Sequence, residues 1–338
     1  MSLVVVTTDR FADHITPPGH PERVERAETL QLVADRWART GGRVLSPRAA
    51  TDEDLLRVHD AEYVVTLKEA RGRATMLDPD TFTSPESEDV ARLAAGAVLT
   101  AVDHVLDDAG ARAFVMVRPP GHHAEAERAM GFCLYNNIAV GAAWARSRGV
   151  SRVAVVDYDV HHGNGTQWIF YEDPSVLFIS SHQYPFYPGT GAASEVGRGP
   201  GAGATVNFPM EAGATDADYD LVYREAVATV LEEFRPELLL VSAGFDAHMD
   251  DPLGGMRVTT EGYGALTAGL LAAADRLCGG RIVFVTEGGY DLKALAACCQ
   301  RVIDLAAADR VSAADPVEGD TRRGRETLAA WRAAHARR

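Results

Sequence analysis

Histidine, aspartate and tyrosine side chains follow directly after four short apolar runs in this chain of 338 residues. Enzymes commonly use carboxylates and imidazoles to bind metal ions and to transfer protons, so these segments are the first candidates for a reactive site. The four segments are Pro119-Pro120-Gly121-His122-His123, Asp157-Tyr158-Asp159-Val160-His161-His162-Gly163-Asn164, Ser242-Ala243-Gly244-Phe245-Asp246 and Glu287-Gly288-Gly289-Tyr290.

Asp159, His161 and Asp246 form a candidate set of metal ligands. Residues two apart in an extended segment face the same way, so Asp159 and His161 would point to one place, and Asp246 would join them from another strand end. Two carboxylates and one imidazole leave a position open for water, which is typical of a catalytic metal site. Zn²⁺ fits these ligands, and Fe²⁺ or Co²⁺ could occupy them as well. Asp157 would face the same side and orient a neighbouring imidazole.

The elements that must position these residues alternate regularly along the chain. Seven short runs are mostly apolar, as expected of strands buried on both faces of a parallel sheet. They lie at 4–6, 113–117, 153–156, 176–179, 205–208, 238–241 and 282–285. Helical apolar spacing is found at 86–108, 136–148, 216–234 and 259–278. The alternation predicts a single-domain α/β fold with a mostly parallel sheet flanked by helices on both faces. Its ligand site would lie beyond the carboxyl ends of the strands.

Composition excludes several classes of protein. The 33 Lys and Arg residues against 48 Asp and Glu give a net charge of −15, which disfavours binding to nucleic acid or to an anionic membrane. No stretch approaches the roughly 20 apolar residues that span a bilayer, and the N-terminus lacks the basic region of a signal peptide. The four cysteines form no CxxC pair, so we expect a cytoplasmic protein without a disulfide framework. The oligomeric state stays open, a homo-oligomer included.

No linker, repeat or low-complexity block interrupts residues 1–308, which we expect to form one catalytic domain. Residues 309–338 have a different composition, with a turn at Glu318-Gly319-Asp320 and a basic, Ala-rich end. They predict a peripheral helix or a frayed terminus.

Taken together, the four segments and the motif Gly131-Phe132-Cys133 with Asn136-Asn137 resemble the histone deacetylase and acetylpolyamine amidohydrolase superfamily. The likeness covers about residues 1–308, and Asn164 and the Glu-Gly-Gly-Tyr segment resemble the class II branch and its bacterial relatives. The resemblance implies an arginase/deacetylase-like fold and a Zn²⁺-dependent amide hydrolase. Such an enzyme removes an acyl group, usually acetyl, from acetyl-lysine side chains or from small acetylated amines, acetylpolyamines being the alternative substrate.

The same resemblance implies roles for individual residues. Asp159, His161 and Asp246 would hold the metal, which polarises the acetyl carbonyl and activates water. His123, oriented by Asn164, would take the water proton and pass it to the leaving amine, while His122, paired with Asp157, would stay protonated. The further residues implied are Tyr290 as donor to the oxyanion, Gly131, Phe132, Tyr187, Leu253 and Gly289 around the substrate, and Asp157, Asp159, His161, Ser180 and Ser181 around a K⁺ or Na⁺ ion.

Three positions depart from the usual pattern of the superfamily. Asn164 is an amide where many members have an aspartate. Tyr187 stands where the wall of the substrate tunnel is usually Phe, and Phe186 would take that place if the register shifts by one. Leu253 stands where some polyamine-selective members carry an acidic residue, which weakens the polyamine alternative.

Two further alternatives come from other classes of protein. An arginase-type enzyme with two metals would draw on Asp246-Ala247-His248-Met249-Asp250-Asp251-Pro252, but Gly163 stands where the alternation would present the next carboxylate. An inactive module that binds acetylated ligands could lose His123 or Tyr290 freely, and both are present.

The acidic segment 78–89 resembles the rim loop of the superfamily and predicts a mouth that favours cationic or neutral substrates. Its other interpretation is a helix start whose acidic residues complement the macrodipole.

Overall fold

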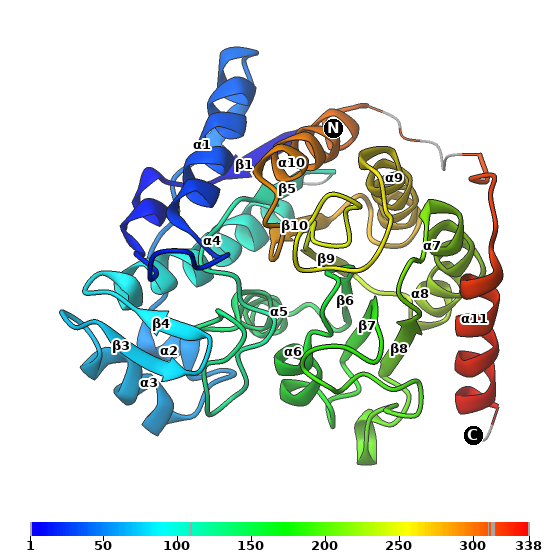
Figure 1. Cartoon of the computed structure of the whole chain (residues 1–338), viewed down its shortest axis with the longest axis horizontal. Helices are drawn as coiled ribbons and strands as arrows, with labels where there is room; N and C mark the ends of the chain where they lie inside the picture. Colours follow the sequence, from blue (N-terminus) through cyan, green and yellow to red (C-terminus); the bar gives the residue numbers. More distant parts are fainter. Residues whose placement is uncertain (1, 109, 310, 312–314, 337–338) are drawn as a thin grey trace.

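The computed structural model describes residues 2–108, 110–309, 311 and 315–336. Its centre is an eight-stranded sheet of order β2-β1-β5-β10-β9-β6-β7-β8, in which every neighbouring pair is parallel (Figure 1). This arrangement confirms the predicted α/β fold, and all seven predicted runs are strands. The strands span Leu3–Val6 (β1), Arg43–Leu45 (β2), Arg112–Val115 (β5), Val153–Asp157 (β6), Val176–Gln183 (β7), Thr205–Met210 (β8), Leu238–Ala243 (β9) and Ile282–Thr286 (β10).

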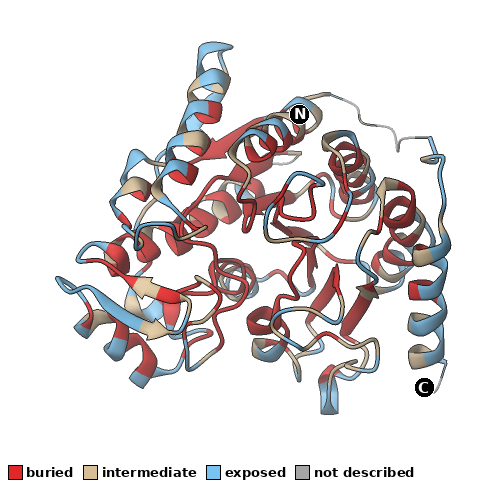
Figure 2. Cartoon of the chain, viewed as in Figure 1, coloured by how far each residue is buried: buried red, intermediate tan, exposed pale blue. Residues whose placement is uncertain are grey.

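Helices cover both faces of the sheet. One apolar core lies under α1 (Val24–Arg39), α7 (Asp216–Val222), α8 (Ala228–Phe234), α9 (Thr260–Leu277) and α10 (Leu292–Ala306). The other lies under α4 (Ser87–Asp107) and α5 (Asn137–Ser147). Leu3 and Val5 of β1 enter the first core, and Val4 and Val6 enter the second. The central strands are therefore buried throughout (Figure 2), which explains their nearly continuous apolar sequences.

The predicted helix at 216–234 has a mixed hydrogen-bonding pattern. It runs through α7, a π-helical turn at Tyr223–Val227 and α8 without a break. The other elements are the 3-10 helices Asp9–Asp13 and Gly199–Gly201, the helices Asp52–Leu55 (α2), Ala61–Glu69 (α3) and Asn164–Ile169 (α6), and an antiparallel hairpin of Thr75–Asp78 (β3) and Thr81–Thr83 (β4).

Several elements carry too weak a pattern to be predicted from the sequence. The edge strand β2 has only three residues and is largely exposed, and β3 has four residues, none of which is buried. Helix α1 is highly charged and buries a narrow stripe that includes Leu30, Val33 and Ala34. Their positions depend on packing against the rest of the fold more than on their own composition.

The C-terminal helix α11 (Arg322–His335) lies along the outer side of α7 and β8, at the right edge of Figure 1. Leu328 is buried there, and the Thr327 hydroxyl donates to the carbonyl of Pro209 at 2.9 Å. Residues 310, 312–314, 337 and 338 of the predicted tail lie outside the described residues. Within the described part of the chain, no helix is both long and apolar enough to cross a membrane.

A buried cluster of charges joins the N-terminal segment to the sheet. Glu22 accepts hydrogen bonds from Arg118 at 2.5 Å and from Arg26 at 2.9 Å, and all three side chains are fully buried. Arg26 also donates to the carbonyls of Glu287 at 2.5 Å and Gly289 at 2.8 Å. Burial opposes the charge of Glu22, but Arg118 and a hydrogen bond from His14 hold the pKa of its carboxyl well below its usual range. The start of α1 is thereby tied to the loop after β10.

Replacing Glu22 with Ala should lower the free energy of unfolding by about 3–5 kcal/mol at pH 7, because Arg118 and Arg26 would stay buried without their carboxylate. The folded-state pKa of Glu22 lies below its unfolded value. Its stabilisation is therefore present above about pH 5 and is lost as the pH falls further. Urea unfolding of wild type and variant measures both effects. Glu25→Ala, which removes an exposed carboxylate three residues further along the chain, is the control and should change stability by less than about 0.5 kcal/mol. An equally small change for Glu22→Ala would contradict this account.

Candidate active site

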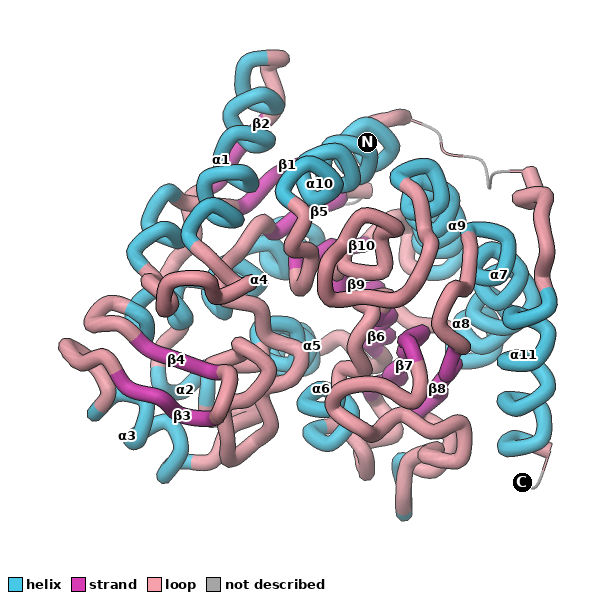
Figure 3. The backbone as a smooth tube through the Cα atoms, viewed as in Figure 1, coloured by secondary structure: helices cyan, strands magenta, loops and turns pink. Residues whose placement is uncertain are grey.

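The carboxyl ends of four neighbouring strands bring the reactive segments together. β5, β10, β9 and β6 are consecutive in the sheet. The register pairs Asp157 at the end of β6 with Ser242 of β9, and Ala243 of β9 with Thr286 of β10. Each strand therefore leads into its loop at the same edge of the sheet. Figure 3 shows loops filling the middle of the view, between the hairpin β3–β4 and α11.

Asp159, His161 and Asp246 meet as a buried group. One possible ligand atom from each lies within 4.8 Å of the others. Nδ1 of His161 is 3.2 Å from Oδ1 of Asp159 and 3.1 Å from Oδ2 of Asp246. Among the described residues, this is the one such group of three or more His, Cys, Asp or Glu side chains. Two carboxylates and an imidazole at this spacing fit a divalent ion of the zinc type.

Burial controls the protonation of these three side chains. Together with the charge of Asp159, it raises the pKa of Asp246 to about 7. Burial alone would lower the pKa of His161, but hydrogen bonds with Asp159 and Asp246 raise it to about 10. A bound cation would remove the repulsion between the two carboxylates, and it would displace protons from this group at neutral pH.

Glycines allow the main chain to approach the two carboxylates. A Cβ atom at Gly288 would lie 2.0 Å from Oδ2 of Asp246, and one at Gly244 would lie 1.9 Å from Oδ2 of Asp159. The amide of Gly288 donates to Oδ2 of Asp159 at 2.8 Å, and the amide of Val160 donates to Oδ1 of Asp246 at 2.8 Å. Any larger residue at either glycine would disturb the group.

The two adjacent histidines have different partners. Nδ1 of His122 lies 2.9 Å from Oδ2 of Asp157, and Nδ1 of His123 lies 2.7 Å from Oδ1 of Asn164. Burial alone would lower the pKa of His122, but the charges of Asp157 and Asp159 raise it well above its usual value. Burial and the neighbouring cationic His122 lower the pKa of His123 well below its usual value. The two environments therefore favour the charged form of His122 and the neutral form of His123.

A narrow cavity of about 80 Å³ reaches this group from outside. Phe132 and Tyr187 line it together with Gly131, and His123 and His161 lie at its wall. The remaining lining residues are Asp80, Leu253 and Tyr290. Gly131 is required for close packing, because a Cβ atom there would lie 2.4 Å from Cδ2 of His123 and its φ is +56°. The predicted substrate residues thus converge on one cavity, with Gly289 in the chain beside Tyr290.

Both aromatic residues of the Phe186-Tyr187 pair lie near the site, in different places. Tyr187 lines the cavity, and its ring is edge-on to His123 with the ring centres 5.2 Å apart. Phe186 instead stacks on His161 at 5.2 Å. Tyr187, and not Phe186, therefore lines the cavity together with Phe132.

Tyr290 is held in position from several sides. Its amide donates to Oδ2 of Asp251 at 2.6 Å, and its ring lies 5.0 Å from the guanidinium carbon of Arg26 and 5.9 Å from the ring of Phe132. The carbonyl of the preceding Gly289 accepts from Arg26, as described above. This network presents the tyrosine at the cavity wall.

Ser180 and Ser181 follow the pairing of β6 with β7. Ser180 is in register with Asp157, and the Ser181 hydroxyl lies 3.5 Å from the carbonyl of Asp157. Both serines are fully buried. Of the residues predicted to surround a monovalent ion, Ser180 and Ser181 are therefore neighbours of Asp157.

The family model for the histone deacetylase domain matches residues 20–306. The chain belongs to the histone deacetylase family. It is 41% identical over 292 residues to a probable deacetylase of Archaeoglobus fulgidus, a match that covers 86% of this chain and 81% of that protein. It is also 41% identical over 314 residues to a histone deacetylase-like amidohydrolase of Pseudomonas aeruginosa, covering 90% and 82% of the two chains. These relatives identify the protein as a hydrolase, so the predicted family and enzyme class are confirmed.

Two further proteins extend the comparison. The crystal structure of the HDA15 HD domain matches with a TM-score of 0.89 and 37% identity, covering 98% of this chain and 94% of that one. Histone deacetylase 10, chloroplastic, of Oryza sativa subsp. japonica is 40% identical over 288 residues, which are 81% of this chain and 65% of that protein.

Within this member of the histone deacetylase family, the segment proposed for a second metal serves other purposes. Asp251 binds the amides of Tyr290, Asp291 and Leu253. A Cβ atom at Gly163 would lie 2.3 Å from Oδ2 of Asp157, so no side chain fits there without disturbing the His122–Asp157 pair. These contacts disfavour the arginase-type alternative.

The acidic segment 78–89 contributes less charge to the cavity than its composition suggests. Glu88 is buried between Arg71 and Arg92 at 2.5 and 2.6 Å, and Asp89 pairs with Arg71 at 2.9 Å. Asp80 is the member that lines the cavity. The expected acidic rim is therefore concentrated in Asp80.

Sequence reasoning missed residues that act through distant partners. Glu287 accepts from the amides of Gly121 and His122 at 2.7 and 3.1 Å and from the Ser242 hydroxyl at 3.0 Å, while burial raises its pKa to about 7. The one sequence feature that points to Glu287 is its position in the Glu-Gly-Gly-Tyr segment. Asp251 was visible within the segment considered for a second metal, and its contacts depend on the folded loop.

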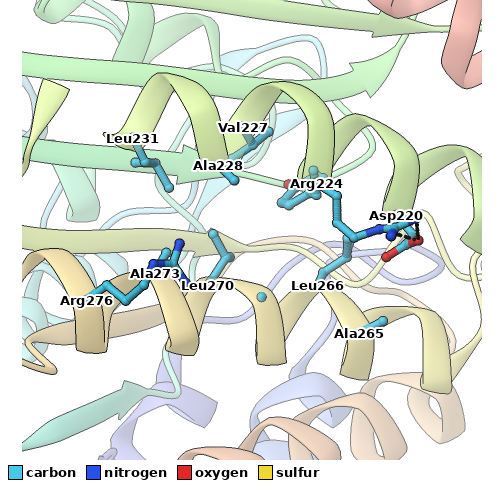
Figure 4. Close-up of a pocket in the computed structure, with 12 residues that line it drawn as sticks. Asp220, Arg224, Val227, Ala228, Leu231, Ala265, Leu266, Leu270, Ala273 and Arg276 are labelled. Carbon is cyan, nitrogen blue, oxygen red and sulfur yellow. Dashed lines mark hydrogen bonds and ion pairs between the residues drawn. The ribbon is translucent and has the colours of Figure 1, made fainter. Parts of the chain in front are cut away.

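A second hollow lies away from the strand ends. A groove of about 280 Å³ runs between α9 and the helical stretch from α7 to α8, with Asp220 paired to Arg224 at 2.8 Å at one end (Figure 4). Apolar side chains such as Leu231, Leu266 and Leu270 line it. It shares no lining residue with the cavity at His123.

Zinc binding to the metal-free chain should release at least one proton per ion at pH 7, because His161 is protonated there and Asp246 is partly so. The apparent association constant should consequently rise about tenfold or more per pH unit from pH 6 to 7. Titration calorimetry in two buffers with different ionisation enthalpies measures the protons released. Asp246→Asn should bind zinc far more weakly, whereas Asp250→Asn, an exposed neighbour, should bind it normally. Affinity independent of pH would contradict the predicted protonation.

Proposed function

We propose that this protein is a Zn²⁺-dependent deacetylase that hydrolyses the amide bond of an acetylated amine, either an acetyl-lysine side chain or a small acetylated amine. The observation that carries the proposal is the buried group of Asp159, His161 and Asp246, with His161, His123 and Tyr290 at the wall of one narrow cavity. The similarity to proteins named deacetylase and amidohydrolase supports the reaction. Fe²⁺ or Co²⁺ would suit the same ligands.

When bound, the divalent ion supplies a Lewis acid that polarises the acyl carbonyl and makes water a better nucleophile. In this proposal, His123 acts as both general base and general acid. Its neutral imidazole takes a proton from the attacking water and delivers it to the nitrogen of the leaving amine. His122, charged beside Asp157, stabilises the negative charge that develops during the attack. The different environments of the two histidines thus suit them to different tasks.

Tyr290 donates a hydrogen bond to the acyl oxygen in this proposal. Burial raises the pKa of its hydroxyl well above the usual value, so the group keeps its proton at neutral pH. Asp251 and Arg26 hold its main chain and ring before substrate arrives. A donor fixed in advance stabilises a developing oxyanion more effectively than one that must reorient.

The cavity favours a slender, uncharged chain next to the amide. Phe132 and Tyr187 form its walls, and Leu253 adds an apolar side chain near Tyr290. The methylene chain of an acetyl-lysine suits such walls. Acetylpolyamines remain the alternative substrates, since they present the same amide on a longer chain with further cationic groups.

Three further parts of the proposal concern the setting of the enzyme. A K⁺ or Na⁺ ion would bind near Asp157, Asp159, His161, Ser180 and Ser181, supported by the buried contacts of both serines with the Asp157 region. Residues 1–308 would be the catalytic domain, with α11 as a peripheral helix. Four free, buried cysteines favour a reducing compartment such as the cytoplasm.

Tyr290→Phe should lower kcat on an acetyl-lysine peptide by about a hundredfold or more, because it deletes only the oxyanion donor, and should change KM much less. Steady-state kinetics of the zinc-loaded full chain measure both constants. Tyr171→Phe, which removes a hydroxyl from a tyrosine packed on Trp168, is the matched control and should be fully active. An unchanged kcat in Tyr290→Phe would exclude the role of this tyrosine as the oxyanion donor. The proposed function itself is tested on wild type with a panel of acetyl-lysine peptides, acetylputrescine, acetylspermidine and longer acyl-lysines. Hydrolysis of none of them would refute it.

Peptides with Lys or Arg beside the acetyl-lysine should have higher kcat/KM than peptides with Glu there, because the Asp80 carboxylate lines the cavity. The difference should shrink as salt screens it. In Asp80→Asn it should shrink at low salt as well, whereas Asp89→Asn, whose carboxylate pairs with Arg71, should leave it intact. A preference that is insensitive both to salt and to Asp80→Asn would have another origin.

A further inference from the structure

The amide of Asn164 bridges two groups whose hydrogen-bonding needs differ. Its Oδ1 atom lies 2.7 Å from Nδ1 of His123, and its Nδ2 atom donates to Oε1 of Glu125 at 2.7 Å and, at the longer distance of 3.4 Å, to the carbonyl of His123. All three side chains are buried. Asn164 thus connects the histidine at the cavity to a carboxylate that does not line it.

Glu125 is held as an acceptor on its outer side. Arg128 donates to Oε2 at 3.0 Å and to Oε1 at 2.9 Å, so both oxygens of this ion-paired carboxylate accept hydrogen bonds. An ionised carboxylate has no hydrogen to donate. The Glu125 carboxylate can therefore face only the NH₂ group of Asn164. If the amide were rotated by 180°, its oxygen would lie against a carboxylate oxygen, and the two would repel each other.

This selection of one amide orientation has a consequence for His123. With Nδ2 directed to Glu125, the atom facing His123 is Oδ1, which can only accept. Nδ1 of His123 must then carry the hydrogen of the neutral imidazole. The other ring nitrogen, Nε2, is left with the lone pair that a general base needs.

The loop around Glu125 holds this geometry firmly. The amide of Glu125 donates to the carbonyl of Arg128 at 3.0 Å, and its carbonyl lies 3.0 Å from Nδ1 of His59. A Cβ atom at Gly165, next to Asn164, would lie 2.2 Å from the carbonyl oxygen of Ala124, so the two segments are in contact. Neither end of the bridge can move away without disrupting this packing.

We propose that Glu125 is a positioning residue, which fixes the amide of Asn164 and through it the Nδ1–H tautomer of His123. The inference rests on the proposed function for its catalytic meaning, and it concerns a residue that neither lines the cavity nor belongs to the group of Asp159, His161 and Asp246. Its chemical content, the tautomer of His123, can be measured without turnover.

Glu125→Gln is the informative variant, because it keeps the shape and changes only the hydrogen-bonding character. Arg128 is a donor and would retain the single oxygen of the new side-chain amide, so the NH₂ group of the introduced glutamine would turn to Asn164. Oδ1 of Asn164 would then face this glutamine, and Nδ2 would face Nδ1 of His123. That arrangement favours the Nε2–H tautomer, which lacks the required lone pair.

The exchange variant Glu125→Gln/Asn164→Asp supplies a rescue. The introduced aspartate can accept from Nδ1 of His123 with one oxygen and from the NH₂ group of the introduced glutamine with the other. The Nδ1–H tautomer is thereby restored with the number of carboxylates unchanged. A purely structural role for Glu125 predicts no such recovery, because the double variant carries two substitutions instead of one.

The experiment combines kinetics and spectroscopy on the zinc-loaded full chain. For Glu125→Gln we expect kcat on an acetyl-lysine peptide to fall by about tenfold to a hundredfold with KM within about twofold, since the general base is affected and the cavity is not. The double variant should regain most of this loss at a pH where its His123 is neutral, because a carboxylate in place of Asn164 also favours the charged imidazole. Glu127→Gln, an exposed glutamate two residues away, is the control and should behave as wild type.

Nitrogen-15 spectra of histidine-labelled protein, with His123 assigned by His123→Gln, report which ring nitrogen carries the hydrogen. We expect Nδ1–H in wild type, Nε2–H in Glu125→Gln and, at a pH where the imidazole of His123 is neutral, Nδ1–H again in the double variant. An Nδ1–H tautomer that persists in Glu125→Gln, or an Nε2–H tautomer in wild type, would overturn the inference. Should Glu125→Gln not fold, Glu125→Ala takes its place with a mixture of tautomers expected, and a single Nδ1–H form would overturn the inference. A wild-type chain without deacetylase activity would refute the proposed function alone, because the spectra still decide the role of Glu125.

Discussion

Four carboxyl groups withdrawn from water at one edge of the sheet are the constraint on which the rest of the site depends. Asp157, Asp159, Asp246 and Glu287 are all fully buried. A buried carboxylate is strongly destabilising unless hydrogen bonds or opposite charges compensate it. Much of that compensation comes from main-chain amides, namely those of Gly121, His122, Asp159, Val160, His161 and Gly288. The positive charge of His122 compensates a further part of the buried negative charge, and the proposed divalent cation would compensate the rest.

This compensation explains why glycine recurs where the strands end. A main-chain amide can bind a carboxylate only at about 3 Å. A Cβ atom at Gly288 or Gly244 would lie only about 2 Å from a carboxylate oxygen, which is too close for any side chain. A parallel sheet favours this arrangement, because the carboxyl ends of its strands lie at one edge and bring several loops to the same place. The metal group, the histidines and the cavity are consequences of this single convergence.

The strands and the grouping of Asp159, His161 and Asp246 could be predicted from the sequence because both depend largely on local patterns. Strands covered on both faces have continuous apolar runs, and Asp159 and His161 alternate within one segment. The hairpin β3–β4 has no comparable signal. Glu22 and Glu125 act through partners 96 and 39 positions away, Arg118 and Asn164, so no spacing in the sequence marks them. The separate positions of Phe186 and Tyr187 likewise depend on the folded loop.

His122 and His123 show that the environment of a side chain decides its chemistry more than its type. Their ring centres are 4.1 Å apart, but one faces a carboxylate and the other an amide. A carboxylate beside His123 would favour its charged form, whereas an amide can orient the ring without adding charge. An amide, however, has two orientations of similar shape, and only one of them leaves the base its lone pair. In our proposal, the carboxylate of Glu125, which is paired with Arg128, selects one orientation of the Asn164 amide. Because Glu125 contacts Asn164 and not the ring of His123, its negative charge stays away from the base.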